Sequence, residues 1–359
     1  KNVMRVFSVV LLVMVGTVFA VGPAGLIVTL ITNGGGSGIF ASKELWLWII
    51  LVYYFMATFI SIDQIIGRIY PIFGICLIIM ALGIMGGMLF GVGGHTMPEL
   101  TLQNLHPAGP EKMPIWPLMF ITVACGAISG FHSTQSPIMA RCLKDERLGR
   151  PVFYGAMVSE GIIALIWAAA GVAFYGATDM LNNALTTLGQ SGTVYEISNT
   201  MLGVAGGALA VVGVVVCPIT SGDTAFRSAR LILAEITHLD QKKIRNRLII
   251  TLPLLAVGAV LTQLDFNVLW RYFSWSNQTL AMISLWVATA YLLKEGRYRL
   301  GSLMTALPGT FMSAVSLTYI LMAQEGFGLK ASVSWPAGLV FAAVMLGIYL
   351  CQLKRRLSQ

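Results

Sequence analysis

The residues best suited to chemistry form one short polar run inside an oily stretch of the chain. This run reads CGAISGFHSTQSP and extends from Cys125 to Pro137. Its glycines and proline disfavour a continuous helix. A broken helix exposes backbone amides and carbonyls, and the amino end of a half-helix favours an anion. We therefore predict a binding site that contains these residues: Gly126, Ser129, Gly130, Phe131, His132, Ser133, Thr134 and Gln135.

Two plainer interpretations of this polar run stay open. The run can be the kinked end of a span that leads into an ordinary loop. His132 can be a buried neutral histidine whose ring nitrogens are satisfied by hydrogen bonds. Both alternatives predict packing rather than ligand binding.

A second polar group lies in the stretch WRYFSWSNQTLA. Its arginine, Arg271, could attract a substrate carboxylate at an outer gate, because a guanidinium group matches a carboxylate in shape and charge. It could equally snorkel to the membrane surface beside its aromatic neighbours. Asn277 and Gln278 follow about two helical turns later and add amide donors and acceptors. We include all three in the predicted substrate site.

Glu160 is a candidate for ion coupling because it lies inside another apolar stretch. It follows Pro151 by nine residues, which places it roughly 14 Å into a helix that begins there. A carboxyl group at that depth must be protonated, paired across helices or in contact with water, and such a group suits proton uptake. A shallow vestibule on the cytoplasmic side is the simpler alternative.

Further candidates for ion coupling lie beyond a proline in the stretch PITSGDTAFRSAR. Thr220, Ser221 and Asp223 could hold a cation or relay a proton. Asp223 could instead form an ion pair with Arg227 four residues later on the same helix. The sequence favours a functional role for the two hydroxyl residues and a structural pair for the aspartate.

The composition identifies the environment in which these residues must work. The chain has 359 residues, of which 57% are hydrophobic and only 11% are charged, whereas soluble domains carry about 25% charged residues. This excludes a soluble enzyme or a nucleic-acid-binding protein. The five cysteines show no disulfide or metal-ligand spacing. No nucleophile–base or metal-ligand constellation is visible, so we expect neither an enzyme nor a metal or cofactor site.

The elements that must position the polar residues are hydrophobic segments long enough to cross a membrane. Backbone polar groups in a bilayer must be satisfied internally, so the segments are expected to be helices. Two short polar or amphipathic pieces, 95–112 and 179–197, are interpreted as loops on one side of the membrane. We predict an all-α integral membrane protein with about ten transmembrane helices, in one transporter domain over 1–359, at these positions: 4–31, 45–62, 69–92, 115–135, 151–176, 200–222, 247–264, 267–293, 301–323 and 334–353.

The distribution of basic residues predicts how the chain is oriented. Of the 23 Lys and Arg residues, 19 fall at the termini and in every second loop, and only three fall on the opposite side. Basic residues accumulate on the cytoplasmic side of a membrane. Both termini are therefore predicted to be cytoplasmic, and the net positive charge reflects topology rather than nucleic-acid binding.

Several stretches resemble one family of bacterial inner-membrane transporters, the carbon starvation protein A family. The similar stretches are ACGAISGFHSTQSP, GRPVFYGAMVSEGIIALIWA, PITSGDTAFRSAR and WRYFSWSNQTLA. The family is similar to the amino acid–polyamine–organocation superfamily. The resemblance implies two inverted repeats of five helices, each with a broken first helix, and it places the second of these breaks near 126–137.

The resemblance also implies a function. Some family members take up pyruvate by proton symport and others take up peptides, so a small carboxylate such as pyruvate is the expected substrate and a peptide the alternative. The coupling ion is expected to be a proton, with sodium as the alternative. A membrane sensor or accessory subunit without transport of its own is a further hypothesis. The first span resembles the family's third core helix, so the preceding helices are expected to be absent from this sequence.

Overall fold

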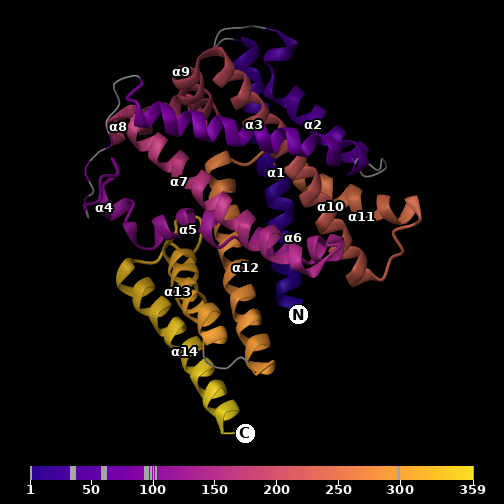
Figure 1. Cartoon of the computed structure of the whole chain (residues 1–359), viewed down its shortest axis with the longest axis vertical. Helices are drawn as coiled ribbons and strands as arrows, with labels where there is room; N and C mark the ends of the chain where they lie inside the picture. The colour runs from indigo at the N-terminus through magenta and orange to yellow at the C-terminus, as the bar shows by residue number, and fades with distance from the viewer. Residues whose placement is uncertain are drawn as a thin grey trace. The chain divides into compact units, whose positions relative to one another are not determined.

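The structure is a computed structural model that describes residues 2–32, 38–57, 63–92, 97, 99, 101, 103–296 and 300–358. Helices are the only regular elements in this described part (Figure 1). The chain separates into two compact units, and each is described by itself. The first unit comprises Lys1–Leu11, Pro110–Met157 and Asn267–Gln359, and the second comprises Leu12–Gly109 and Val158–Phe266.

The first unit contains the predicted substrate residues. Its core includes a buried apolar cluster around Ile121, Met312 and Tyr319. Pairing between the last two long helices adds to this core, because Gly338 lies directly against Thr318 of the preceding helix. The helices of this unit are α5 (Ile115–Ala127), α6 (Gly130–Cys142), η2 (Glu146–Leu148), η3 (Arg150–Gly155), α12 (Phe266–Lys294), α13 (Leu300–Met322) and α14 (Ala331–Leu357).

The second unit contains the predicted ion-coupling residues. One apolar cluster of its core joins three helices through Met80, Phe174 and Ile197. The helices of this unit are most of α1 (Asn2–Thr32), η1 (Ile39–Ala41), α2 (Lys43–Ala57), α3 (Asp63–Leu89), most of α7 (Ala156–Tyr175), α8 (Thr178–Thr187), α9 (Gly189–Val211), η4 (Val212–Val216), α10 (Cys217–Thr237) and α11 (Ile244–Leu261), while the short α4 (Gly109–Lys112) lies at the unit boundary.

Six of the ten predicted spans have helices that are long and apolar enough to cross a membrane, judged over the described residues. They are Asn2–Ile31, Pro71–Leu89, Glu146–Tyr175, Ile244–Leu261, Leu300–Met322 and Ala331–Leu357. The span predicted at 45–62 forms the 15-residue α2, and positions 58–62 lie outside the described residues. The other three contain a helix interruption or a polar centre: 115–135, 200–222 and 267–293.

One expectation about the loops is wrong. The stretch 179–197 is helical, because it forms nearly all of α8 and the first part of α9. Its polar and amphipathic character suggested a loop, but the polar residues lie on one face of α8, and α9 begins at Gly189, where φ is 69°. The polar composition of this segment therefore did not predict its backbone conformation.

Two prolines coincide with widened helical turns. Pro151 lies in η3 and Pro218 follows η4, and both of these segments are π-helical. Proline has no N–H to complete an ordinary helical turn. The N–H of Cys217 instead bonds to the carbonyl of Val212, five residues earlier. Such π segments are frequent at functional sites, and these two lie just before Glu160 and Thr220.

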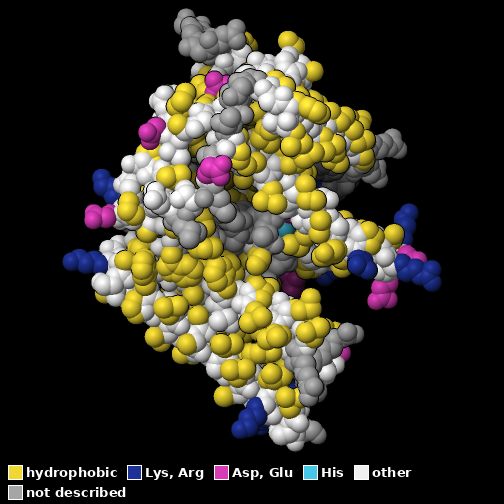
Figure 2. Space-filling model, turned by 60° about the vertical axis from the view of Figure 1, so that its left-hand side comes forward, with side chains coloured by type: hydrophobic (Ala, Val, Ile, Leu, Met, Phe, Trp, Pro, Cys, Tyr) yellow, Lys and Arg dark blue, Asp and Glu magenta, His cyan; other side chains and the backbone are white. Residues whose placement is uncertain are grey.

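The surface is that of a protein suited to lipid. Hydrophobic side chains cover broad areas of the face shown in Figure 2, while charged side chains gather in a few small groups. Large apolar side chains are widely exposed on the spans, such as Leu165 and Met304, each at 71%. Soluble monomers rarely expose apolar patches larger than a few hundred Å². The described helices therefore fit a bilayer environment.

Candidate functional site

The predicted helix break is present in the structure. Helix α5 ends at Ala127 and α6 begins at Gly130, with Ile128 and Ser129 between them. Ser129 is extended, with φ −95° and ψ 131°, and its hydroxyl accepts a hydrogen bond from the Phe131 N–H at 3.3 Å. Pro137 does not contribute to the break, because it lies inside α6. Gly126 is in the last turn of α5.

Helix α12 closes the break with two fully buried amides. The Asn277 Oδ1 accepts hydrogen bonds from the Phe131 N–H at 2.9 Å and from the Ser129 hydroxyl at 3.1 Å. Gln278 donates from Nε2 to the backbone carbonyl of Ile121 in α5 at 3.1 Å. Asn277 and Gln278 are both 0% exposed. One helix therefore satisfies polar groups on both sides of the interruption.

The close approach of α6 to α12 requires a glycine at the first position of α6. A Cβ atom at Gly130 would lie 2.2 Å from the backbone oxygen of Asn277 and 3.0 Å from the backbone nitrogen of Ala281. These distances are far below van der Waals contact, so any side chain would push the two helices apart. The geometry thus links Gly130 to the hydrogen bonds that Asn277 makes.

The remaining polar residues of α6 bond mainly within their own helix. The hydroxyl of Ser133 donates to the Gly130 carbonyl and that of Thr134 to the Phe131 carbonyl, both at 2.7 Å. Gln135 donates from its amide nitrogen to the Thr134 hydroxyl at 3.2 Å. His132 is half-buried in the first turn of α6. These groups lie near the break at the amino end of α6. The hydrogen bond from α12 to that end is made by Asn277.

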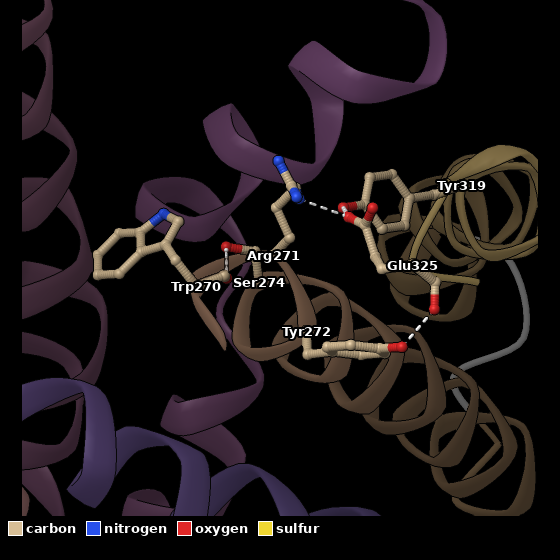
Figure 3. A network of polar contacts seen from close by, with 6 residues as sticks. All are labelled: Trp270, Arg271, Tyr272, Ser274, Tyr319 and Glu325. Atoms are coloured by element: carbon tan, nitrogen blue, oxygen red, sulfur yellow. Dashed lines mark hydrogen bonds and ion pairs between the residues drawn. The ribbon is translucent and has the colours of Figure 1, made fainter. Parts of the chain in front are cut away.

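Arg271 is paired with a carboxylate that the sequence did not single out. Its Nε lies 2.7 Å from Oε1 of Glu325, in the turn after α13. The hydroxyl of Tyr319 donates to the same carboxylate oxygen at 3.0 Å, and that of Tyr272 donates to the Glu325 backbone carbonyl. Figure 3 shows these side chains converging on Glu325. The sequence offered one signal for this pair. Glu325 closely follows the span predicted at 301–323, and this places it near the same membrane surface as Arg271.

In the second unit, the predicted pair between Asp223 and Arg227 is confirmed. The Arg227 Nη2 donates to the Asp223 carboxylate at 3.0 Å, and Asp223 is 5% exposed. The Thr220 hydroxyl donates to the carbonyl of Cys217 at 2.9 Å. Ser221 is half-buried on the same helix, α10. This group is therefore satisfied in part by its own helix.

Tyr54 of α2 lies against the same turn of α10. A Cβ atom at Gly222 would lie 2.1 Å from the Tyr54 hydroxyl, and the Tyr54 ring packs on Phe226 at 5.6 Å between ring centroids. Tyr54 is almost fully buried. A phenol therefore lies beside the residue that precedes Asp223, a contact that local sequence patterns do not reveal.

Glu160 is exposed on α7 within its own unit. Contact with water was one of the three environments expected for this carboxyl group, so its role in ion coupling stays a prediction. Among the described residues, no group of three or more His, Cys, Asp or Glu side chains is placed to hold a metal ion.

Comparisons with known proteins match the parts of the sequence that contain the candidate site. The family described as Carbon starvation protein CstA matches residues 1–196 and 203–319. A Haemophilus influenzae relative, described as an uncharacterized membrane protein, is 35% identical over 227 residues, which are 52% of this chain and 61% of that protein. No solved structure matches the chain.

Two further relatives have descriptive names. The peptide transporter CstA of Helicobacter pylori is 24% identical over 305 residues, covering 66% of this chain and 44% of its own length. The pyruvate/proton symporter BtsT of Escherichia coli is 35% identical over 130 residues, covering 35% of this chain and 16% of its own. The chain thus spans less than half of either relative. Because the family match covers most of the sequence, including both halves of the broken helix and the part of α12 that closes it, the chain belongs to the carbon starvation protein CstA family.

Proposed function

We propose that this protein is a secondary transporter of the bacterial inner membrane that takes up a small carboxylate such as pyruvate. One observation carries the proposal: a helix is interrupted at a buried polar site, and a second helix holds both sides of the interruption through Asn277 and Gln278. Interrupted helices of this kind form the substrate sites of secondary transporters. The names of the relatives in peptide and pyruvate transport support the same class of function.

The break offers a direct way to bind a carboxylate. Asn277 now accepts the N–H of Phe131 with a neutral amide oxygen. A carboxylate oxygen is a stronger acceptor than an amide oxygen, and the amino end of α6 favours negative charge. We propose that the substrate carboxylate replaces Asn277 at this N–H. The exchange would keep the buried N–H bonded with and without substrate, which avoids the cost of an unsatisfied donor.

Coupling to a proton, or to sodium, is assigned to the second unit. Its candidates are Glu160, Thr220, Ser221 and Asp223, as the sequence predicted. Asp223 is the most enclosed of these, and its salt bridge to Arg227 would be weakened by proton uptake. We propose that both ends of the chain face the cytoplasm, because the basic residues favour that side.

A peptide is the second candidate substrate, and the extent of similarity favours it. The Helicobacter pylori peptide transporter aligns with 66% of this chain, whereas the pyruvate/proton symporter aligns with 35%. A peptide and pyruvate both present a carboxylate, so the proposed contact with α6 serves either one. The two differ in size and in the positive charge of the peptide's amino group.

Uptake by the complete protein in liposomes tests the function. Radiolabelled pyruvate and a labelled dipeptide would be offered separately, with and without an inward proton gradient. Accumulation of pyruvate that collapses with the gradient would support the first proposal, and accumulation of the dipeptide alone would support the second. Uptake of neither compound above protein-free liposomes would contradict both and favour a sensor or accessory role.

A further inference from the structure

The contacts around Glu325 form a compact network at one end of α12. Arg271 and Tyr272 come from α12, Tyr319 comes from α13, and Glu325 lies in the turn that follows α13. Tyr319 and Arg271 bind the same carboxylate oxygen, while Tyr272 holds the Glu325 backbone (Figure 3). Three side chains from two helices therefore fix the position of one turn residue.

We infer that Glu325 is a positioning residue that orients the Arg271 guanidinium to receive the carboxylate of the transported substrate before that carboxylate reaches the break in α6. The inference rests on the function proposed above and assigns a role to a residue outside the predicted site. Tyr319 and Tyr272 support Glu325 in this role. Arg271 touches the substrate, whereas Glu325 acts through Arg271.

The geometry of the ion pair leaves part of the guanidinium available. Arginine presents five N–H donors in a planar fork, and a carboxylate can engage one edge while a second edge stays open. Glu325 approaches the Nε side of Arg271, and an end nitrogen of the guanidinium points away from Glu325 (Figure 3). Within the described part of the chain, Glu325 is the one charged partner of Arg271.

The exposure of the two side chains is unequal, and this distinguishes their roles. The side chain of Glu325 is 10% exposed and that of Arg271 is 41% exposed. A pair formed only to neutralise charge at a surface would leave both partners accessible and contribute little. Here the carboxylate is enclosed and bonded from two sides, while the cation remains accessible. This arrangement suits a fixed arginine that receives an anion from outside the protein.

The network is connected to the helix break. Arg271 and Gln278 are seven residues apart, so they lie on one face of α12, about 10 Å apart along its axis. Tyr319 belongs to the apolar cluster that contains Ile121 and contacts Ile128. Ile121 supplies the carbonyl that Gln278 holds. A substrate carboxylate received at Arg271 would therefore start on the same face of α12 that reaches the broken helix.

Two opposite effects on substrate affinity must be compared. Glu325 repels an incoming carboxylate, but water screens that repulsion at a half-exposed arginine. Loss of Glu325 would let the flexible arginine side chain adopt many rotamers, which weakens a hydrogen-bonded fork to a carboxylate. We expect the positioning effect to be the larger one. Glu325→Gln should thus weaken binding rather than strengthen it.

The first test measures uptake kinetics of the complete protein with pyruvate and with a dipeptide. Glu325→Gln should raise KM about tenfold with little change in the maximal rate, because the neutral amide keeps an oxygen for Tyr319 but loses the ion pair to Arg271. Tyr319→Phe removes only one donor to Glu325 and should raise KM about threefold. Glu295→Gln, which removes an exposed carboxylate near the other end of α12, is the matched control and should change neither parameter.

A rescue experiment separates positioning from general structural support. Arg271→Ala should lose carboxylate uptake, and added guanidinium ion at a non-denaturing concentration should restore part of it, because Glu325 and the tyrosines still form the pocket for the cation. The double variant Arg271→Ala with Glu325→Gln should show no rescue. Equal rescue in the single and double variants would overturn the inference.

The outcomes distinguish this inference from the proposed function. An unchanged or lower KM in Glu325→Gln, in a protein whose parent transports, would overturn the positioning role and leave transport intact. If Glu325→Gln does not fold, an unchanged KM in Tyr319→Phe has the same consequence. If the parent protein moves neither pyruvate nor the dipeptide, the proposed function fails and this inference fails with it.

Discussion

Two helix interruptions in the protein differ in how they are stabilised. The break at Ser129 is closed by side chains of another helix, with Asn277 accepting the Phe131 N–H. The interruption in α9 occurs at Gly203, where φ is 64° and ψ is −153°. There the chain folds back on itself. Gly206 comes so close to Ser198 that a Cβ atom at Gly206 would lie 2.1 Å from the Ser198 carbonyl oxygen.

The two interruptions differ in whether a ligand could replace the groups that stabilise them. The reversal at Gly203 needs only small residues and a backbone conformation that glycine adopts easily. The break at Ser129 carries donors and acceptors that must find partners inside the protein, and α12 supplies them with Asn277 and Gln278. A buried interruption that depends on another helix can exchange its partners for a ligand. We therefore place the substrate at Ser129 and treat Gly203 as a structural turn.

The largest expected effect comes from Gly130→Ala. The added Cβ would lie 2.2 Å from the Asn277 backbone oxygen, so α6 and α12 must separate. We expect a loss of about 3 kcal/mol in unfolding free energy, from overpacking, and loss of uptake. Thermal unfolding in detergent and transport in liposomes would measure both. Gly171→Ala is the control, since a Cβ there would meet no described atom within 4 Å, and it should unfold at the same or a higher temperature.

The next largest effect is expected from Asn277→Ala. Removing the Asn277 amide takes from the Phe131 N–H its 2.9 Å partner on α12 and leaves it only the longer bond to the Ser129 hydroxyl, at 3.3 Å. The cost should be about 2 kcal/mol in stability, with transport reduced by at least the corresponding factor. Thr289→Val is the matched control, because Thr289 is also buried on α12 but bonds to Leu285 and Thr305, away from the break. Normal uptake by a folded Asn277→Ala protein would contradict this distinction, because the Ser129 break would then be no more important for transport than the Gly203 turn.

The smallest effect is expected from Gly203→Ala. An alanine at φ 64° and ψ −153° is strained, because this region is essentially restricted to glycine, and we expect a cost of about 1.5 kcal/mol in unfolding free energy. Uptake by the folded protein should keep the KM of the parent, because no substrate contact is assigned to this turn. A KM shift comparable to that of Asn277→Ala would contradict the distinction between the interruptions.

Local patterns in the sequence were sufficient for several of these features. The density of glycine, serine and proline predicted a break within 126–137, and the break lies at Ile128 and Ser129. The pairing of Asp223 with Arg227 followed from their spacing of four residues on one helix. Both predictions depend on neighbours in sequence, whose geometry a helix fixes.

Contacts between distant segments could not be predicted in the same way. Glu325 is 54 residues from Arg271, and only the packing of α13 against α12 brings them to 2.7 Å. Asn277 was predicted to bind substrate, and in the structure it accepts the Phe131 N–H at the amino end of α6. The sequence identified the polar residues, but which polar group satisfies which depends on tertiary packing.

The central claim is that substrate binds at the Ser129 break and not at the Gly203 turn. Cysteine labelling tests it most directly, with Ser133→Cys beside the break and Asn199→Cys beside the turn, each in the complete protein with its native cysteines replaced. We expect transported substrate to slow maleimide labelling at position 133 and to leave labelling at position 199 unchanged. Equal labelling at position 133 with and without saturating substrate, in a variant that still transports, would show that substrate does not bind at the Ser129 break.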